Sequence, residues 1–111
     1  MKLINIKIHE KPNEGIYIGR PSVFGNPFVI GKDGDREEVI DKYRSWLLNR
    51  VLERNSKVIA ALKKLNDDNV LVCYCSPLKC HGEIIIEFWT EIMMEGDFNT
   101  GLESFIKKYN I

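Results

Sequence analysis

Three cysteines and a histidine lie within residues 73–81 and have the side chains best suited to chemistry in this sequence. Thiolates and imidazoles ligate zinc, and a thiolate can also act as a nucleophile. Zinc is disfavoured here, because there is no C-x-x-C pair and because adjacent Cys80 and His81 would need an awkward backbone to reach one ion. We therefore predict no bound metal, no cofactor, and reduced thiols that pack in the interior.

Cys80 and His81 are the candidate catalytic residues, because the apolar spacing that follows them predicts a helix beginning at this point. The positive end of a helix dipole lowers the pKa of a nearby thiol and keeps an imidazole neutral near pH 7. Neighbouring side chains on a helix do not face each other, which makes His81 a poor general base for Cys80. A buried histidine with one hydrogen-bonded nitrogen explains His81 equally well, so enzyme activity stays open at this stage.

A second polar segment, residues 19–28, contains prolines and glycines that interrupt every helical or strand period and predict an ordered loop. Arg20 offers a planar pair of donors for a phosphate or carboxylate. Ser22 and Asn26 offer a hydroxyl and an amide for a sugar hydroxyl or a base edge. Aromatic side chains such as Phe24 can stack on a base, although phenylalanines in such a loop are more often buried in the core.

The hydrophobic pattern predicts the elements that position these two segments. Alternating isoleucines predict a strand over residues 3–9, and a short second strand follows at 16–18. The continuous apolar run at 70–75 predicts a central strand covered on both faces and paired in parallel with the first. Helices are predicted from Asp35 to Glu53, after Asn55 or Ser56 through Leu65, from Cys80 or His81 to Met94, and after a capping box of Thr100 and Glu103.

This order of elements favours a single α/β domain over residues 1–111: a small three-layer, Rossmann-like fold with a short, mainly parallel sheet flanked by helices. Ligands of such sheets bind beyond the carboxyl ends of the strands, and both polar segments follow a strand. We therefore expect them to form one pocket, which Gly82 would let a ligand approach closely. The expected ligand-binding residues are Arg20, Pro21, Ser22, Phe24, Gly25, Asn26, Cys75, Ser76, Cys80, His81 and Gly82.

Composition excludes several classes of function. Lys plus Arg and Asp plus Glu are both 16, so the formal net charge is 0 and cannot neutralise a long phosphate backbone. Hydrophobic residues make up 44% and charged residues 29%, which is typical of a folded globular protein. No apolar run approaches the roughly 20 residues that span a bilayer, and the N-terminus lacks a signal-peptide core. We expect a cytoplasmic monomer or homo-oligomer without membrane or long nucleic-acid partners.

The two polar segments also resemble a known family. The motifs are IGRPS at residues 18–22, FGNPF at 24–28 and CYC-x-P-x-x-CHG at 73–82, with Tyr43 and Trp46 between them. In this order they resemble the domain of unknown function 4326 family, whose small members are common in phages and bacteria. The resemblance covers most of residues 16–88. It implies a role inside an infected bacterium, in the host cytoplasm, including interference with host defence.

We expect a binding module that captures a small nucleotide-derived molecule. Because the family is associated with phages, this expectation includes the sequestering of a host immune signal. Neutral charge and an anion site made by Arg20 and a helix N-terminus favour this function. The first alternative is an enzyme that acts on a nucleotide or nucleoside through Cys80 or His81. The second is a zinc-stabilised protein-interaction domain.

Overall fold

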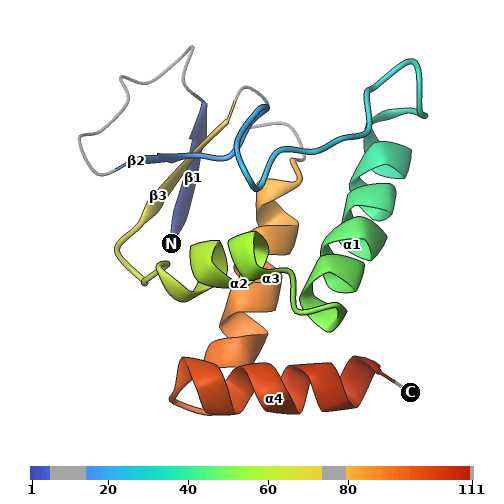
Figure 1. The fold of residues 1–111 in the computed structure, drawn as a ribbon. Coiled ribbons are helices and arrows are strands. Elements are labelled where there is room, and N and C mark those ends of the chain that lie inside the picture. The colour runs from blue at the N-terminus through green and yellow to red at the C-terminus, as the bar shows by residue number, and fades with distance from the viewer. Residues whose placement is uncertain (6–14, 74–79, 111) are drawn as a thin grey trace.

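The computed structural model describes residues 1–5, 15–73 and 80–110. Within these ranges the chain has a three-stranded parallel sheet and four helices, consistent with a small Rossmann-like domain (Figure 1). The predicted α/β class and the predicted order of elements are confirmed. The elements are β1 (Lys2–Asn5), β2 (Gly15–Tyr17), α1 (Arg36–Leu52), α2 (Ser56–Lys63), β3 (Val70–Cys73), α3 (Gly82–Met93) and α4 (Phe98–Tyr109).

The sheet has β3 at its centre, in the order β1-β3-β2, as the continuous apolar run predicts. Both outer strands run parallel to β3, with Lys2 and Gly15 each in register with Val70. The N–H of Ile18 donates to the carbonyl oxygen of Val72 at 3.0 Å, which extends the β2–β3 pairing by one residue. Because the strands are parallel, the segments that follow β2 and β3 begin at the same edge of the sheet.

Helix α1 begins and ends where the sequence predicts. Asp35 is the N-cap and accepts a hydrogen bond from the N–H of Glu38 at 2.9 Å, while the Glu38 carboxylate accepts from the N–H of Asp35 at 3.1 Å. Figure 1 shows the segment after β2 crossing from the sheet to the start of this helix. The buried face of α1 consists of Val39, Ile40, Tyr43, Leu47 and Val51.

Helix α4 begins earlier than expected, and the predicted capping box of Thr100 and Glu103 is wrong. Asp97 is the N-cap, and its carboxylate accepts hydrogen bonds from the N–H and the hydroxyl of Thr100, each at 3.0 Å. Aspartate is preferred to threonine at the N-cap position, which is the physical reason that α4 begins three residues upstream of the predicted start. Glu103 instead forms a two-point ion pair with Arg54, at 2.6 and 2.8 Å.

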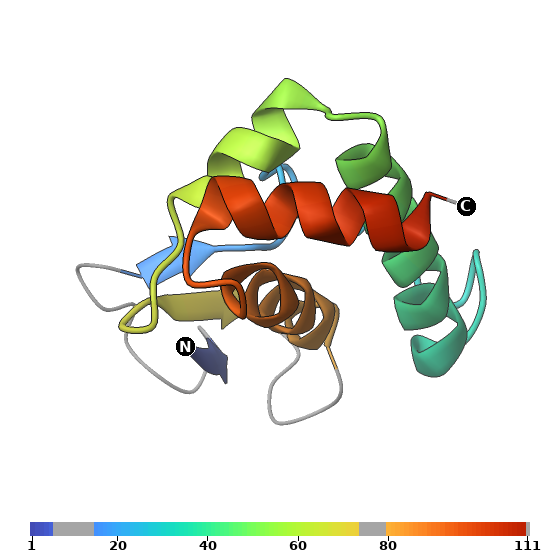
Figure 2. The ribbon, with the colours of Figure 1, turned by 90° about the horizontal axis from the view of Figure 1, so that it is seen from below.

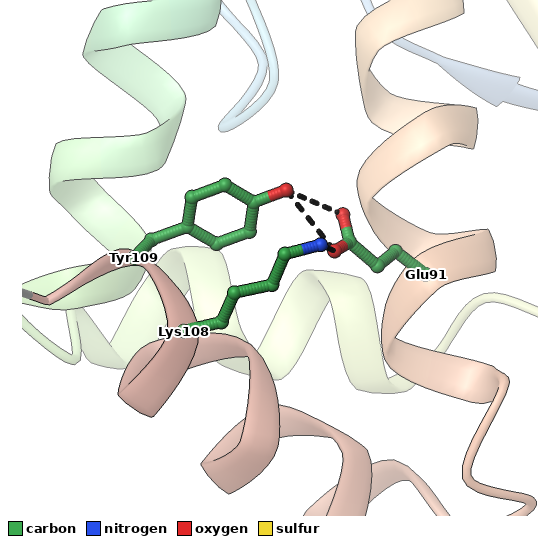
Figure 3. Close-up of polar contacts among 3 residues, drawn as sticks. All are labelled: Glu91, Lys108 and Tyr109. Carbon is green, nitrogen blue, oxygen red and sulfur yellow. Dashed lines mark hydrogen bonds and ion pairs between the residues drawn. The ribbon is translucent and has the colours of Figure 1, made fainter.

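Helices α3 and α4 cross closely near the end of α3 (Figure 2). A side chain at Gly101 would overlap the carbonyl oxygen of Ile92, so glycine is what permits this close crossing. Farther along, Glu91 accepts hydrogen bonds from the ammonium of Lys108 at 2.7 Å and from the hydroxyl of Tyr109 at 3.0 Å (Figure 3). None of the helices in the described part of the chain is both long and apolar enough to cross a membrane.

Candidate functional site

A cavity of about 500 Å³ lies at the carboxyl edge of the sheet. Four segments surround it: the end of β2 with the loop that follows, the start of α1, the end of β3 and the residues just before α3. Its polar and thiol side chains are those of Tyr17, Arg20, Asn26, Arg36, Cys73, Cys80 and His81, and its apolar side chains are those of Phe28, Val29, Ile30, Val39 and Ile40.

The structure brings residues of the two predicted polar segments to this one cavity. Arg20 and Asn26 of the first segment, and Cys80 and His81 of the second, line it. Cys75 and Ser76 lie outside the described residues. The other residues predicted to bind a ligand do not line the cavity: Pro21, Ser22, Phe24, Gly25 and Gly82.

Phe24 anchors the loop in the core. Its side chain is 2% exposed, and its carbonyl oxygen accepts a hydrogen bond from the hydroxyl of Tyr43 at 2.8 Å. Burial raises the pKa of the Tyr43 hydroxyl, which therefore stays protonated and keeps donating. Phe24 is thus a core residue, and Phe28 is the phenylalanine of this loop that borders the cavity.

Gly25 and Arg20 are in close backbone contact within the loop. The N–H of Gly25 donates to the carbonyl oxygen of Ser22 at 2.9 Å, and a Cβ on Gly25 would lie only 3.1 Å from that oxygen and 3.1 Å from Cα of Arg20. The Tyr17 hydroxyl donates to the carbonyl oxygen of Arg20 at 3.1 Å. Gly25 therefore acts through the backbone position of Arg20 rather than by bordering the cavity.

Asn26 ties the loop to α1. Its amide oxygen accepts the N–H of Phe28 at 2.9 Å, and its amide nitrogen donates to the carbonyl oxygen of Val39 at 3.3 Å. These contacts engage the amide oxygen and one of the two N–H groups, so the side chain predicted to recognise a ligand mainly shapes the cavity wall.

Arg36 is a charged cavity residue that was not predicted from the sequence. Arg36 is the first residue of α1, at the other end of the loop from Arg20. Both arginines line the cavity, so two guanidinium groups lie beside it. A cation in the first turn opposes the positive end of the helix dipole. This unfavourable position of a positive charge is the feature of the sequence that could have identified Arg36, because a residue that destabilises its own helix often has a functional role.

His81 is 7% exposed and connects the start of α3 to the end of β2. Its Nε2 lies 2.7 Å from the carbonyl oxygen of Ile18, and because a carbonyl can only accept, Nε2 carries the hydrogen. Burial lowers the pKa of His81, and the charge of Arg20 lowers it further, against opposing contributions from the carbonyls of Ile18 and Phe24. The imidazole is therefore neutral at pH 7, through burial more than through the helix dipole predicted from sequence.

Cys80 contacts His81, contrary to the expectation that the two side chains point apart. Both residues precede α3, which begins at Gly82, so the helical spacing rule does not apply to them. The Sγ of Cys80 lies 3.5 Å from Nδ1 of His81 and accepts the N–H of Gly82 at 3.4 Å. The Cys80 side chain is 1% exposed, so its sulfur is shielded from bulk water beside the cavity.

Gly82 serves packing rather than ligand approach. A Cβ at this position would lie 2.6 Å from a Leu3 methyl carbon and 2.7 Å from one of Ile18. Glycine therefore lets the start of α3 approach the sheet closely, which brings Cys80 and His81 next to the segment that follows β2.

No group of three or more His, Cys, Asp or Glu side chains within residues 1–5, 15–73 and 80–110 is arranged to hold a metal ion. Cys75, one of the four candidate ligands named from sequence, lies outside these ranges.

A short parallel sheet with a cavity at its carboxyl edge defines the class of this protein as a small, Rossmann-like α/β domain. Residues 4–91 match the family described as Domain of unknown function (DUF4326), and the chain belongs to this family. Comparison with curated proteins and with solved structures gives no match. The matched range contains every residue that lines the cavity, whereas α4 lies beyond it.

Proposed function

We propose that this protein binds a small, negatively charged, nucleotide-like molecule in the cavity. The observation that carries the proposal is that two arginines, Arg20 and Arg36, line one cavity whose wall also has an apolar part. Guanidinium groups hold phosphate oxygens through paired, charge-assisted hydrogen bonds. The volume of about 500 Å³ falls in the ordinary range for small-molecule sites, roughly 300 to 1,000 Å³.

The apolar part of the wall suits a flat, weakly polar group such as a nucleobase. Phe28 and Ile40 border the cavity together with the two arginines, so a phosphate and a base can be accommodated in one molecule. Stacking of a base on an aromatic ring contributes about 1 to 3 kcal/mol. The formal net charge of 0 supports a short ligand over a long nucleic acid, which requires an extended basic surface.

The association of the family with phages favours one form of this function, in which the ligand is bound but not chemically changed. A protein that sequesters a signalling nucleotide in the cytoplasm of an infected bacterium would suppress the response that the signal triggers. Sequestration requires binding at the concentration of the signal and needs no turnover.

The test has two stages. Purified protein is exposed to a small-molecule extract of infected cells, separated, and heated, and the released molecules are identified by mass spectrometry. Binding of AMP and adenosine is then measured by calorimetry to the wild type and to Arg20→Ala, Arg36→Ala and Arg44→Ala. Arg44 is the matched control, because it is exposed, pairs with Glu87 and does not border the cavity.

We expect an anionic, base-containing molecule to be released unchanged, and AMP to bind more tightly than adenosine. Loss of one charge-assisted contact should weaken AMP binding at least tenfold in the Arg20 and Arg36 variants, equivalent to about 1.5 to 3 kcal/mol, and leave the Arg44 variant near wild type. Equal affinity of all four proteins for AMP, or no released anion, would overturn the proposal.

A further inference from the structure

We propose that Cys80 is a nucleophile, that His81 is its general base, and that together they form a covalent reaction site beside the cavity. The three contacts that support this are those of His81 with Ile18, of His81 with Cys80, and of Cys80 with Gly82. The inference goes beyond ligand capture, because it gives the cavity a chemical reaction. It rests on the proposed function only for the identity of the substrate.

The first step of the argument is the tautomer of His81. Nε2 is committed as a donor to the carbonyl oxygen of Ile18 at 2.7 Å. In a neutral imidazole the other nitrogen, Nδ1, then has a lone pair and no hydrogen. That lone pair is on the nitrogen 3.5 Å from the Cys80 sulfur, so the thiol can donate its proton to Nδ1. The Ile18 carbonyl therefore orients the His81 imidazole, as the third residue of a catalytic triad orients the general base.

The second step concerns the charge on sulfur once the proton has left. The N–H of Gly82, the first residue of α3, points at Sγ from 3.4 Å. A backbone donor and the positive end of a helix both stabilise a thiolate. Cys80 therefore has a base for its proton and a donor for the resulting negative charge.

The third step concerns the state of the base. The groups facing the His81 ring are the carbonyls of Ile18 and Phe24, the charge of Arg20, Cys80, and the Tyr43 ring in an edge contact with ring centroids 4.8 Å apart. Burial is the largest influence on the pKa of His81 and lowers it. A histidine that is neutral at pH 7 is ready to accept a proton.

The substrate that fits is a nucleotide-like molecule with an electrophilic carbon that carries a leaving group, whereas a captured ligand without such a carbon is released unchanged. The proton of Cys80 moves to Nδ1 of His81, the sulfur forms a bond to that carbon, and the leaving group departs with the bonding electron pair and takes the proton from His81. Arg20 and Arg36 would hold the phosphate end of the same molecule, since they border the same cavity.

The test uses iodoacetamide as a small carbon electrophile on the full-length protein, with the modified cysteine identified by peptide mass spectrometry. Sulfur–carbon bond formation releases iodide with its electron pair, and the thiol proton goes to His81. The central comparison is His81→Gln, because a glutamine amide can still donate to the Ile18 carbonyl but cannot act as a base. Cys80→Ser identifies the signal that belongs to Cys80, and Cys73 serves as an internal reference.

In the wild type we expect alkylation of Cys80 at a rate that changes little between pH 7 and 8, because the pKa of His81 is lowered from 6.5 and the imidazole is mainly neutral over that range. In His81→Gln the rate should be at least tenfold lower at pH 7 and rise about tenfold per pH unit, as for an ordinary thiol with a pKa of about 8.5. The pH profile of the wild type decides the question on its own if the variant does not fold.

The inference would be overturned by no alkylation of Cys80 in the folded protein, by a wild-type rate that rises tenfold per pH unit like a simple thiol, or by equal rates in the wild type and a folded His81→Gln. Release of one zinc per chain by a chelator, with a matching gain in thiol reactivity, would also overturn it in favour of a structural metal site. The measurement needs no bound nucleotide, so failure here and failure of the AMP-binding test are separate outcomes.

Discussion

Replacing Tyr43 with phenylalanine tests whether α1 holds the loop that carries Arg20. The Tyr43 hydroxyl is fully buried and donates to the carbonyl oxygen of Phe24 at 2.8 Å. The substitution removes one oxygen atom from a side chain that otherwise keeps its packing, including the contact of its ring with His81. The loss is therefore confined to one buried hydrogen bond between α1 and the loop.

The expected cost follows from the environment of that bond. A typical hydrogen bond contributes about 1 kcal/mol net, but a buried carbonyl left without its donor costs about 1 to 3 kcal/mol. Phe24 is 2% exposed, so water cannot easily replace the Tyr43 hydroxyl, and the upper half of that range applies. For a domain of 111 residues, a loss of about 2 to 3 kcal/mol corresponds to a fall in Tm of roughly 9 to 13 °C.

Urea unfolding of the purified variant measures this cost, and Tyr109→Phe is the matched control. Tyr109 also loses a hydroxyl hydrogen bond, to Glu91, but it is 36% exposed and should cost under about 0.5 kcal/mol (Figure 3). AMP binding by folded Tyr43→Phe should also weaken, because the loop that positions Arg20 has lost an anchor. Equal stabilities of the two variants would refute the reasoning.

Two further predictions concern the fold and its pH dependence. Gly101→Ala should destabilise the protein by about 1 to 3 kcal/mol in urea unfolding, because the added methyl overlaps the carbonyl of Ile92, whereas Ser104→Ala on the exposed face of α4 should have little effect. The pKa of His81 is lowered in the folded protein from 6.5, so the unfolded state binds more protons below that pH and stability falls as the pH drops below about 6.5. In His81→Gln this fall should be absent between pH 7.5 and 5, a range above the titration of carboxylates such as Asp97, and an unchanged slope would contradict the assignment.

Much of the fold follows from local sequence signals. Asp35 is the predicted N-cap of α1, and Asn55, one of the two N-caps predicted for the next helix, is the N-cap of α2. The continuous apolar run identifies β3 as the central strand, since a strand covered on both faces has no polar alternation. The start of α4 is the helix boundary predicted wrongly, although aspartate is a stronger N-cap residue than threonine and Asp97 lies three residues upstream of Thr100.

The candidate site is only partly predictable, for a physical reason. Parallel strands bring their carboxyl ends to one edge, so the meeting of the loop after β2 with the start of α3 follows from topology. The roles of single side chains do not follow from topology, because they depend on distances between atoms that the spacing of residues in the sequence does not give. Asn26 uses its amide to join the loop to α1, and Phe24 is in the core, although both have the side chains expected of ligand-binding residues.

The contact between Cys80 and His81 shows where a local rule gives the wrong answer. Adjacent residues diverge on a helix, but these two precede the first helical residue, Gly82, and one hydrogen bond to Ile18 rotates the imidazole so that Nδ1 faces the sulfur. The determining partner is 63 residues away in sequence and becomes a neighbour only because the end of β2 lies against the start of α3. The contact between these two side chains therefore depends on the sheet topology, and a variant that loosens the packing of Gly82 on the sheet should weaken it.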